Sequence, residues 1–253
     1  MTQLKRCLLV LALLLVPLLA GMSAAQAVDA IEDCAECPPL VPIPAGVLIP
    51  DDAPPRPIAA FLMGQTEVTF SQWQACVNAH ACKGGQSDHG WGSGSRPIIN
   101  INYTEALEYV NWLNRITKRT YRIPNEDEWE WAARGGTHTL FWWGNDPGEG
   151  NANCRACGTQ WSGRMTAPVG SFNPNPYGLY DTAGNVWEWT SSCWNIKRAA
   201  PPAEQDCQQR AARGGAWYYI PLQSRSNARA RHPITLWSYT VGFRVAAELE
   251  THP

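Results

Sequence analysis

Hydrophobic positions divide the chain into a helical half and a half without helical periodicity. Apolar residues recur every three to four positions over 69–79 and 104–117, which predicts two amphipathic helices. A third short helix is predicted over 126–133, because Asn125 supplies an N-cap and Glu128, three residues later, completes a capping box. Beyond this third helix the helical period disappears.

Residues 135–250 are aromatic and interrupted by glycines, a pattern typical of short antiparallel strands joined by long structured loops. The strand candidates there are 211–217 and 241–246, and residues 41–46 predict a further strand that ends in a turn. No linker-like stretch separates helices from strands. We therefore expect one irregular α+β domain over residues 28–250, with little regular secondary structure.

The pattern at the N-terminus predicts a secretory signal peptide over residues 1–27. A basic pair at 5–6 precedes an apolar run over 8–19, and the small residues Ala25 and Ala27, separated by Gln26, fit a cleavage site, so we expect cleavage after Ala27. The alternative is an uncleaved membrane anchor, but the apolar run is shorter than the roughly 20 residues that a spanning helix needs. We expect an exported protein, periplasmic or secreted, without a stable membrane anchor.

The composition of the chain argues against one class of partner and predicts the kind of hydrophobic core. The chain carries 20 Lys and Arg against 22 Asp and Glu, so no excess of positive charge marks a phosphate-binding surface, and nucleic acid is not an expected partner. It also contains 13 Trp, 21 Gly and 20 Pro. This composition predicts a loop-rich domain whose core is built on indole rings, unlike a helical bundle or a parallel-sheet enzyme.

The cysteines agree with an exported protein. Of nine cysteines, Cys7 lies in the predicted signal peptide, and an even number in an exported chain predicts disulfides. Many connectivities are possible, and the simplest joins neighbours in the sequence: 34–37, 76–82, 154–157 and 193–207. Two alternatives stay open, namely a zinc site built from the two C-x-x-C pairs, which lie far apart in the sequence, and a thioredoxin-like redox centre.

Five motifs follow one another over nearly the whole mature chain, from about Val41 to Ala246. They are Thr66–Thr69 (TEVT), Tyr121–Gly136 (YRIPNEDEWEWAARGG), Gly178–Trp189 (GLYDTAGNVWEW), Arg213–Trp217 (RGGAW) and Gly242–Arg244 (GFR). Their sequence and order resemble the formylglycine-generating enzyme family, also called the sulfatase-modifying-factor family, and ordered motifs are far more specific than one short pattern. The resemblance implies a single C-type-lectin-like domain with little regular secondary structure and with bound calcium.

The resemblance places one structural calcium ion on the turn at 181–188. The family's ligands match the Asp181 and Glu188 side chains and the Gly184 and Val186 carbonyls. Carboxylates and carbonyls in a tight turn suit a hard cation; the alternative is that the two acidic side chains are loop caps without a metal. A second family calcium site would use Asn153 and the Cys154 carbonyl, but residues 161–163 supply no carboxylate to complete it.

Copper is not an expected cofactor of this chain. Family members that oxidise a sulfatase cysteine carry two cysteines just after an R-G-G-S block, and these thiolates bind copper(I), which prefers soft ligands. Here the block ends in Ala216, and the two cysteine positions fall on Tyr219 and near Gln223 or Ser224. Copper-dependent oxidation therefore lacks its ligands, and no catalytic residue is assigned.

The segments that match the family's substrate groove are aromatic and cationic. Aromatic rings beside guanidinium groups favour a peptide, or an acidic, planar or sugar-like ligand, through stacking and bidentate hydrogen bonds. The alternative is that the arginines pair with structural carboxylates and the aromatic rings fill the core. The groove candidates are Trp187, Trp217, Tyr218, Tyr219, Arg225, Arg229, Arg231 and His232.

Three functions agree with these patterns. The first is an exported maturation factor that binds an extracytoplasmic protein or peptide client. The second is an active formylglycine-generating oxidase with a divergent site, which the missing cysteines oppose. The third is a non-catalytic, lectin-like binding module, which differs from the first only in whether turnover occurs, so enzymatic activity stays open.

Overall fold

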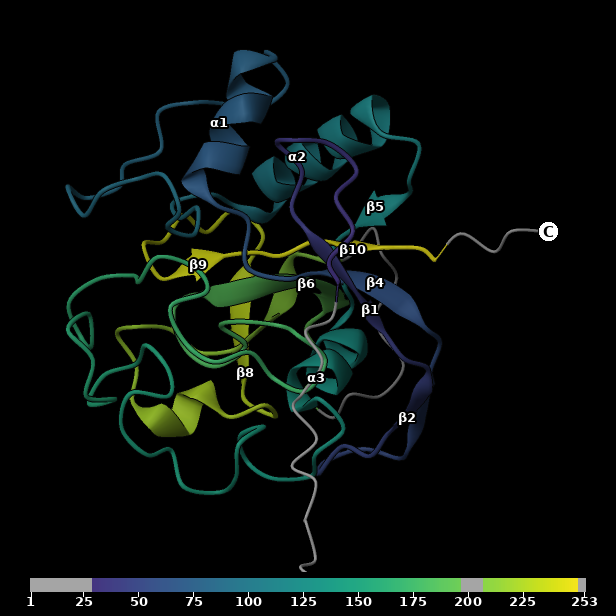
Figure 1. The fold of residues 1–253 in the computed structure, drawn as a ribbon, viewed down its shortest axis with the longest axis vertical. Coiled ribbons are helices and arrows are strands. Elements are labelled where there is room, and N and C mark those ends of the chain that lie inside the picture. Colours follow the sequence, from purple (N-terminus) through teal and green to yellow (C-terminus); the bar gives the residue numbers. More distant parts are fainter. Residues whose placement is uncertain (1–28, 197–206, 250–253) are drawn as a thin grey trace, which may run out of the picture.

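The computed structural model describes residues 29–196 and 207–249; the predicted signal peptide lies outside the described residues. Three α-helices lie in this part of the chain (Figure 1): α1 (Phe70–Asn78), α2 (Tyr103–Ile116) and α3 (Glu126–Arg134). Each begins at a capping box, in which the N-cap side chain accepts a hydrogen bond from the N3 amide and the N3 side chain accepts one from the N-cap amide. The three predicted helices are confirmed.

The described residues form two four-stranded sheets and one two-stranded sheet. The first sheet has the order β1 (Leu40–Ile43), β4 (Phe61–Gly64), β10 (Ala246–Ala247), β5 (Tyr121–Arg122). The second has the order β8 (Arg229–Pro233), β7 (Gln209–Arg213), β6 (Trp187–Cys193), β9 (Val241–Gly242), and only β6 and β9 pair in parallel. The strands β2 (Gly46–Leu48) and β3 (Arg56–Ile58) pair with each other in a separate two-stranded sheet. The domain is α+β, as predicted.

The two predicted strands in the C-terminal half differ in detail from those in the structure. The predicted strand at 211–217 ends at Arg213, because Gly214 and Gly215 adopt positive φ angles of 95° and 77° and turn the chain out of the sheet. The predicted strand at 241–246 is two short strands, β9 and β10, which belong to different sheets. This segment therefore connects the two sheets.

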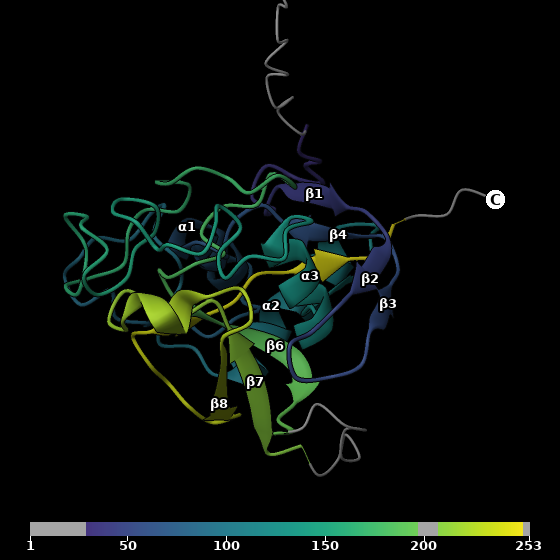
Figure 2. The same cartoon turned by 90° about the horizontal axis from the view of Figure 1, so that it is seen from below.

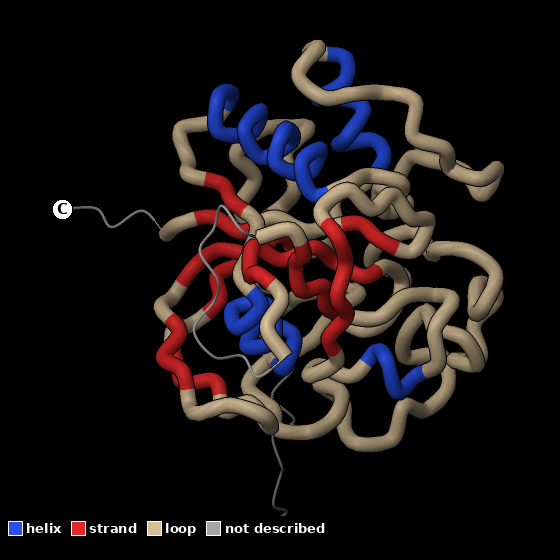
Figure 3. The backbone as a smooth tube through the Cα atoms, turned by 180° about the vertical axis from the view of Figure 1, so that it is seen from behind, coloured by secondary structure: helices blue, strands red, loops and turns tan. Residues whose placement is uncertain are grey.

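Strand β6 was not predicted as a strand, because its first four residues are all buried and show no alternation of polar and apolar positions. Trp187 and Trp189 pack in the core beneath α1 and α2, whereas Glu188 bonds to Trp129 of α3 on the opposite face. Figures 1 and 3 show the same arrangement, with α1 and α2 on one side of the strands and α3 on the other.

The core is built on aromatic rings, as the composition predicted. Trp73, Trp129 and Trp189 are among the largest fully buried side chains. Trp73 stacks on Tyr109 with ring centroids 5.8 Å apart, and Tyr109 meets Phe243 edge-on at 5.6 Å. Packed rings of this kind bury large apolar areas, so a few of them hold together a domain with short helices and strands.

The eight described cysteines form four disulfides between sequence neighbours: Cys34–Cys37, Cys76–Cys82, Cys154–Cys157 and Cys193–Cys207. The simplest predicted pairing is confirmed, and the zinc alternative is wrong because the C-x-x-C sulfur atoms bond to each other. Both C-x-x-C pairs lie in loops. Among the described residues, no helix has both the length and the apolar character needed to cross a membrane.

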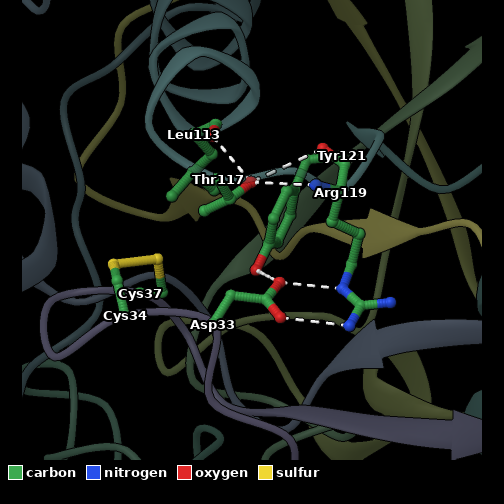
Figure 4. The surroundings of a disulfide bond; sticks show 7 residues. All are labelled: Asp33, Cys34, Cys37, Leu113, Thr117, Arg119 and Tyr121. Atoms are coloured by element: carbon green, nitrogen blue, oxygen red, sulfur yellow. Dashed lines mark hydrogen bonds and ion pairs between the residues drawn. A yellow bond between two sulfur atoms is a disulfide. The ribbon is translucent and has the colours of Figure 1, made fainter.

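The first described segment is fastened to the domain by a side-chain clamp beside the Cys34–Cys37 disulfide (Figure 4). The Asp33 carboxylate accepts hydrogen bonds from Arg119 Nε at 2.8 Å, from Arg119 Nη2 at 3.1 Å and from the Tyr121 hydroxyl at 2.6 Å. Arg119 lies between α2 and β5, and Tyr121 is the first residue of β5. The clamp therefore joins the start of the described chain to the first sheet.

Candidate functional site: a pocket beside the second sheet

A pocket of about 350 Å³ opens where β6 and β8 meet the loop that follows β7. Figure 2 shows the short 3₁₀ helix of this loop, Pro221–Ser224, near β8. The pocket combines aromatic walls with two arginines and one histidine. Its lining residues are Trp187, Tyr219, Leu222, Gln223, Arg225, Ala228, Arg229, Ala230 and His232.

Strand β8 supplies one wall of the pocket. Ala230 and His232 line it, and Ala230 pairs with Ala212 of β7, so that small side chains leave room in front of the sheet. Arg231, between them, is exposed and does not line the pocket. Alternate residues of a strand point to opposite faces, which explains the difference.

Gly215 lets the 3₁₀ helix pack against the end of β7. A Cβ atom at Gly215 would lie 2.6 Å from the Gln223 carbonyl oxygen, and its φ is 77°, so a side chain does not fit there. The close approach buries Ser224 beneath the loop, while Tyr219 and Gln223 line the pocket. Both positions that the family resemblance assigns to cysteine therefore lie in or next to the pocket wall.

Arg229 is held by structural partners. Its Nε and Nη2 donate to the two carboxylate oxygens of Glu126, both at 2.8 Å, and Nη2 also donates to the Asn195 carbonyl at 2.9 Å. The guanidinium lies over the Trp194 ring, 4.6 Å from its centroid. For this residue the structure matches the alternative stated above, an arginine paired with a structural carboxylate.

Arg225 is the cation that the pocket can offer to a ligand. Its Nε donates to the Leu222 carbonyl at 2.8 Å, which fixes the side chain at the pocket. Among the described residues, Arg225 forms no salt bridge. A guanidinium oriented in this way can bind a carboxylate or another planar anion through its terminal nitrogens.

His232 places a neutral imidazole in the pocket wall. Burial lowers the pKa of His232 below its usual 6.5, so the ring is uncharged at neutral pH. The ring meets Trp189 edge-on at 5.8 Å, and its Nε2 atom is buried without a hydrogen-bond partner among the described residues. A ligand can supply that partner.

Two further groove candidates, Trp217 and Tyr218, lie outside the pocket lining and belong to a chain of contacting rings that we call the aromatic rim. Ring centroids are 5.8 Å apart for Tyr219 and Tyr218, 5.5 Å for Tyr218 and Trp217, and 5.2 Å for Trp217 and Trp91. The ring centroids of Tyr239 and Trp217 are 5.7 Å apart. The rim consists of Trp91, Trp217, Tyr218 and Tyr239, and it extends the pocket's aromatic wall to the surface, where Tyr218 and Tyr239 are exposed.

Trp91 and Tyr239 were missed as site residues. Trp91 lies in a glycine-rich loop more than a hundred positions from Trp217, and no local pattern links the two. The one available signal was that Trp91 stands in a loop without apolar neighbours in the sequence. A tryptophan of the core is expected among apolar neighbours, so this one pointed to a role of the loop itself.

The predicted calcium turn contains a buried charge network. Glu188 accepts from Arg244 Nε at 2.6 Å and Nη2 at 2.7 Å, and from Trp129 Nε1 at 2.6 Å, so both of its oxygens have partners. Asp181 is 5% exposed, and its Oδ1 has no hydrogen-bond partner among the residues that the structure describes. The predicted ligand set, which also included the Gly184 and Val186 carbonyls, therefore fits a cation only in part.

A third carboxylate, Glu67, faces this network. Burial, together with the charges of Asp181 and Glu188, raises the pKa of Glu67 well above its usual range. Burial also raises the pKa of Asp181, to about 6. Glu67 comes from the first family motif and was not predicted as a site residue.

At the predicted second calcium site, the Asn153 Oδ1 atom is buried and has no hydrogen-bond partner in the described part of the chain, and Asn153 Nδ2 donates to the Met165 carbonyl at 3.0 Å. The Cys154 carbonyl accepts the Cys157 amide at 3.1 Å. Within residues 29–196 and 207–249, no three His, Cys, Asp or Glu side chains converge as a metal-binding group. The assignment of a metal here stays a prediction.

The helices on both faces of short mixed sheets, the long structured loops and the pocket beside an R-G-G turn define a C-type-lectin-like domain of the formylglycine-generating type. The chain belongs to the sulfatase-modifying factor family: the model of the sulfatase-modifying factor enzyme 1-like domain matches residues 28–249.

Mouse formylglycine-generating enzyme is 31% identical over 178 residues, which cover 61% of this chain and 45% of the enzyme. Mouse inactive Cα-formylglycine-generating enzyme 2 is 36% identical over 161 residues, 56% of this chain and 46% of that protein. The chain thus spans less than half the length of these curated relatives. The structure of PvdO from Pseudomonas aeruginosa superposes with a TM-score of 0.75 at 28% identity, and the match covers 89% of this chain and all of PvdO.

Proposed function

We propose that the protein is an extracytoplasmic maturation factor that binds a peptide or protein client in the pocket and does not oxidise cysteine with copper. One observation carries the proposal. Tyr219 and Gln223 line the pocket at the segment where the family's oxidases carry cysteines, and the eight described cysteines are all in disulfides. A site without thiolates lacks the soft ligands that copper(I) needs.

The form of the site favours an extended client. The pocket supplies aromatic walls, the Arg225 guanidinium and an unpartnered His232 nitrogen, while the aromatic rim continues outward over the surface. A peptide can place one acidic or hydrogen-bonding side chain in the pocket and lay its neighbours on the exposed Tyr218 and Tyr239 rings. Rigid aromatic side chains and arginine are the groups most often found at such anchoring positions.

Export is supported by two independent features. The sequence pattern over residues 1–27 is that of a secretory signal, and four disulfides are typical of proteins outside the reducing cytosol. Family membership alone does not decide activity, because one similar relative is named as an enzyme and another as inactive.

Binding of matched peptides tests the client proposal. The probes are fluorescein-labelled peptides that differ only in Asp or Lys next to a Tyr, titrated by fluorescence anisotropy. We expect the Asp peptide to bind more tightly, and Arg225→Ala to weaken it by about 10-fold or more, since a charge-assisted hydrogen bond contributes about 1.5–3 kcal/mol. Arg231→Ala is the control, because Arg231 is an exposed arginine of the same region that does not line the pocket. Equal affinity for both peptides, or equal effects of the two variants, would contradict the proposed site.

A further inference from the structure

Strand β8 lies at one edge of the second sheet and beside the pocket. The order of that sheet is β8, β7, β6, β9, and within the described residues β8 pairs only with β7. Figure 2 shows β8 as the outermost strand of this group, near the short 3₁₀ helix of the pocket loop. The edge of a sheet presents main-chain donors and acceptors with which a further strand can pair.

The register of β8 against β7 determines which main-chain groups face this edge. The Ile234 amide donates to the Gln208 carbonyl at 3.1 Å, so these two opposite residues form a hydrogen-bonded pair. In an antiparallel ladder, hydrogen-bonded and non-hydrogen-bonded pairs alternate. Counted back along the register, Arg231 and Arg229 occupy non-hydrogen-bonded positions. Their amide and carbonyl groups therefore point away from β7, toward the edge.

These edge-facing groups are available to a ligand. In the part of the chain that the structure describes, the amides and carbonyls of Arg229 and Arg231 have no hydrogen-bond partner. The residues that alternate with them, Ala230 and His232, line the pocket. Successive side chains of a strand point to opposite faces of the sheet, so a strand added beside β8 would direct every second side chain to the face on which the pocket lies.

The length and charge of this edge favour a peptide over a second copy of the chain. Pro233 ends β8 and has no N–H, so the edge accommodates only a short added strand. A second copy that paired through its own β8 would bring two exposed Arg231 side chains to one edge, and like charges disfavour such pairing. A short extended segment of a client meets neither obstacle.

We infer that a client peptide adds to the edge of β8 as an extended strand, held by main-chain hydrogen bonds to Arg229 and Arg231, while one of its side chains enters the pocket. The inference rests on the proposed function and adds how the client backbone is recognised. Main-chain bonds of this kind supply affinity for many sequences, and the pocket supplies selectivity for one side chain. The client segment is therefore extended, without proline at the positions that face β8.

Single N-methylations of the fluorescein-labelled Asp peptide test the pairing on the wild-type protein. A methyl group on a peptide nitrogen removes a donor and blocks the approach of a neighbouring strand. We expect methylation at alternate residues to weaken binding by about 10-fold and methylation at the residues between them to change it by less than about 2-fold. Weakening without this period of two, in a peptide whose binding still depends on Arg225, would overturn the added strand and leave the pocket proposal standing. Absence of binding by the Asp and Lys peptides alike would overturn both.

Arg231→Pro makes the matched change on the protein. Proline removes the N–H that faces the edge and leaves the bonds to β7 in place, a substitution that edge strands tolerate, whereas the control Arg231→Ala keeps the N–H. We expect Arg231→Pro to weaken the Asp peptide by about 3- to 10-fold and Arg231→Ala by less than about 2-fold, both with the far-UV circular dichroism of the wild type. Equal affinities of the two folded variants would overturn the inference. So would a wild type that sediments as a dimer and becomes a monomer in Arg231→Pro, because a second copy would then occupy the edge.

Discussion

Asp33→Asn removes the charge from the clamp that fastens the first described segment, with almost no change in shape. The wild-type carboxylate accepts three hydrogen bonds from Arg119 and Tyr121 (Figure 4). The Asp33 and Arg119 side chains are each only 14% exposed, so solvent screens the pair weakly. The variant removes the negative charge that faces the largely buried Arg119 guanidinium.

The expected cost follows from this geometry. Breaking a fully buried ion pair from one side costs about 3–5 kcal/mol, and the residual exposure of this pair reduces the cost to about 2–3 kcal/mol. For a domain of this size, that loss of unfolding free energy lowers the thermal midpoint by about 5–10 °C. Glu32→Gln, one residue earlier and exposed, is the matched control and should change the free energy of unfolding by less than about 0.5 kcal/mol.

The stabilisation that Asp33 contributes is expected to depend on pH. Burial alone would raise the pKa of Asp33, but the hydrogen bonds from Arg119 and Tyr121 and the Arg119 charge outweigh it and hold the pKa below its usual 3.8. The folded state therefore binds fewer protons than the unfolded state, and the stabilisation is complete above about pH 4 and is lost as the pH falls through the lowered pKa.

Urea unfolding of wild type, Asp33→Asn and Glu32→Gln at pH 7, 5 and 3 measures these effects directly. We expect the difference between wild type and Asp33→Asn to be equal at pH 7 and 5 and to shrink at pH 3. Two results would refute the reasoning. The first is a free energy of unfolding of Asp33→Asn at pH 7 equal to that of the Glu32→Gln control, and the second is a difference in this free energy between wild type and Asp33→Asn that grows on acidification.

Three further outcomes are expected. Gly215→Ala should lower the free energy of unfolding by about 2–4 kcal/mol, because the new Cβ meets the Gln223 carbonyl and the backbone there is left-handed. The control for calorimetry is Gly94→Ala, where φ is also positive but open space surrounds the new Cβ, so the comparison separates the steric clash from the backbone strain. Trp129→Phe should cost about 1–3 kcal/mol by leaving a Glu188 oxygen without its indole donor, as measured by urea unfolding. Thiol labelling of the denatured, non-reduced mature protein should find no free cysteine, and two or more labelled cysteines would contradict the disulfide pairing.

The helices could be predicted from the sequence because their signals are local. Asn125 and Glu128 form the predicted capping box, and Gly135 ends α3 in a left-handed conformation. The neighbouring cysteine pairs could be predicted for the same reason. Strand β6 could not, because it is covered on both faces and therefore lacks the polar and apolar alternation that marks a half-buried strand.

The site was predicted in its aromatic and cationic character but not in its arrangement. Arg229 and Arg225 look alike in the sequence, and only the fold shows that Glu126, more than a hundred positions away, neutralises the first. The pairing of Arg244 with Glu188 had the same long-range origin, and it gives both oxygens of a predicted calcium ligand an arginine partner. Such choices depend on contacts between distant segments, which spacing along the chain does not encode.

The central claim is that this family member keeps the pocket and has lost the copper chemistry. The most direct test is mass spectrometry of a sulfatase-type cysteine peptide after incubation with the mature protein, copper(I) and oxygen. An active formylglycine-generating enzyme, incubated with the same peptide in a parallel reaction, is the positive control. Our account predicts that the peptide keeps its mass in the presence of this protein while the active enzyme converts it, because Tyr219 and Gln223 offer no thiolate. A loss of mass corresponding to formylglycine, dependent on copper and on this protein, would contradict the account.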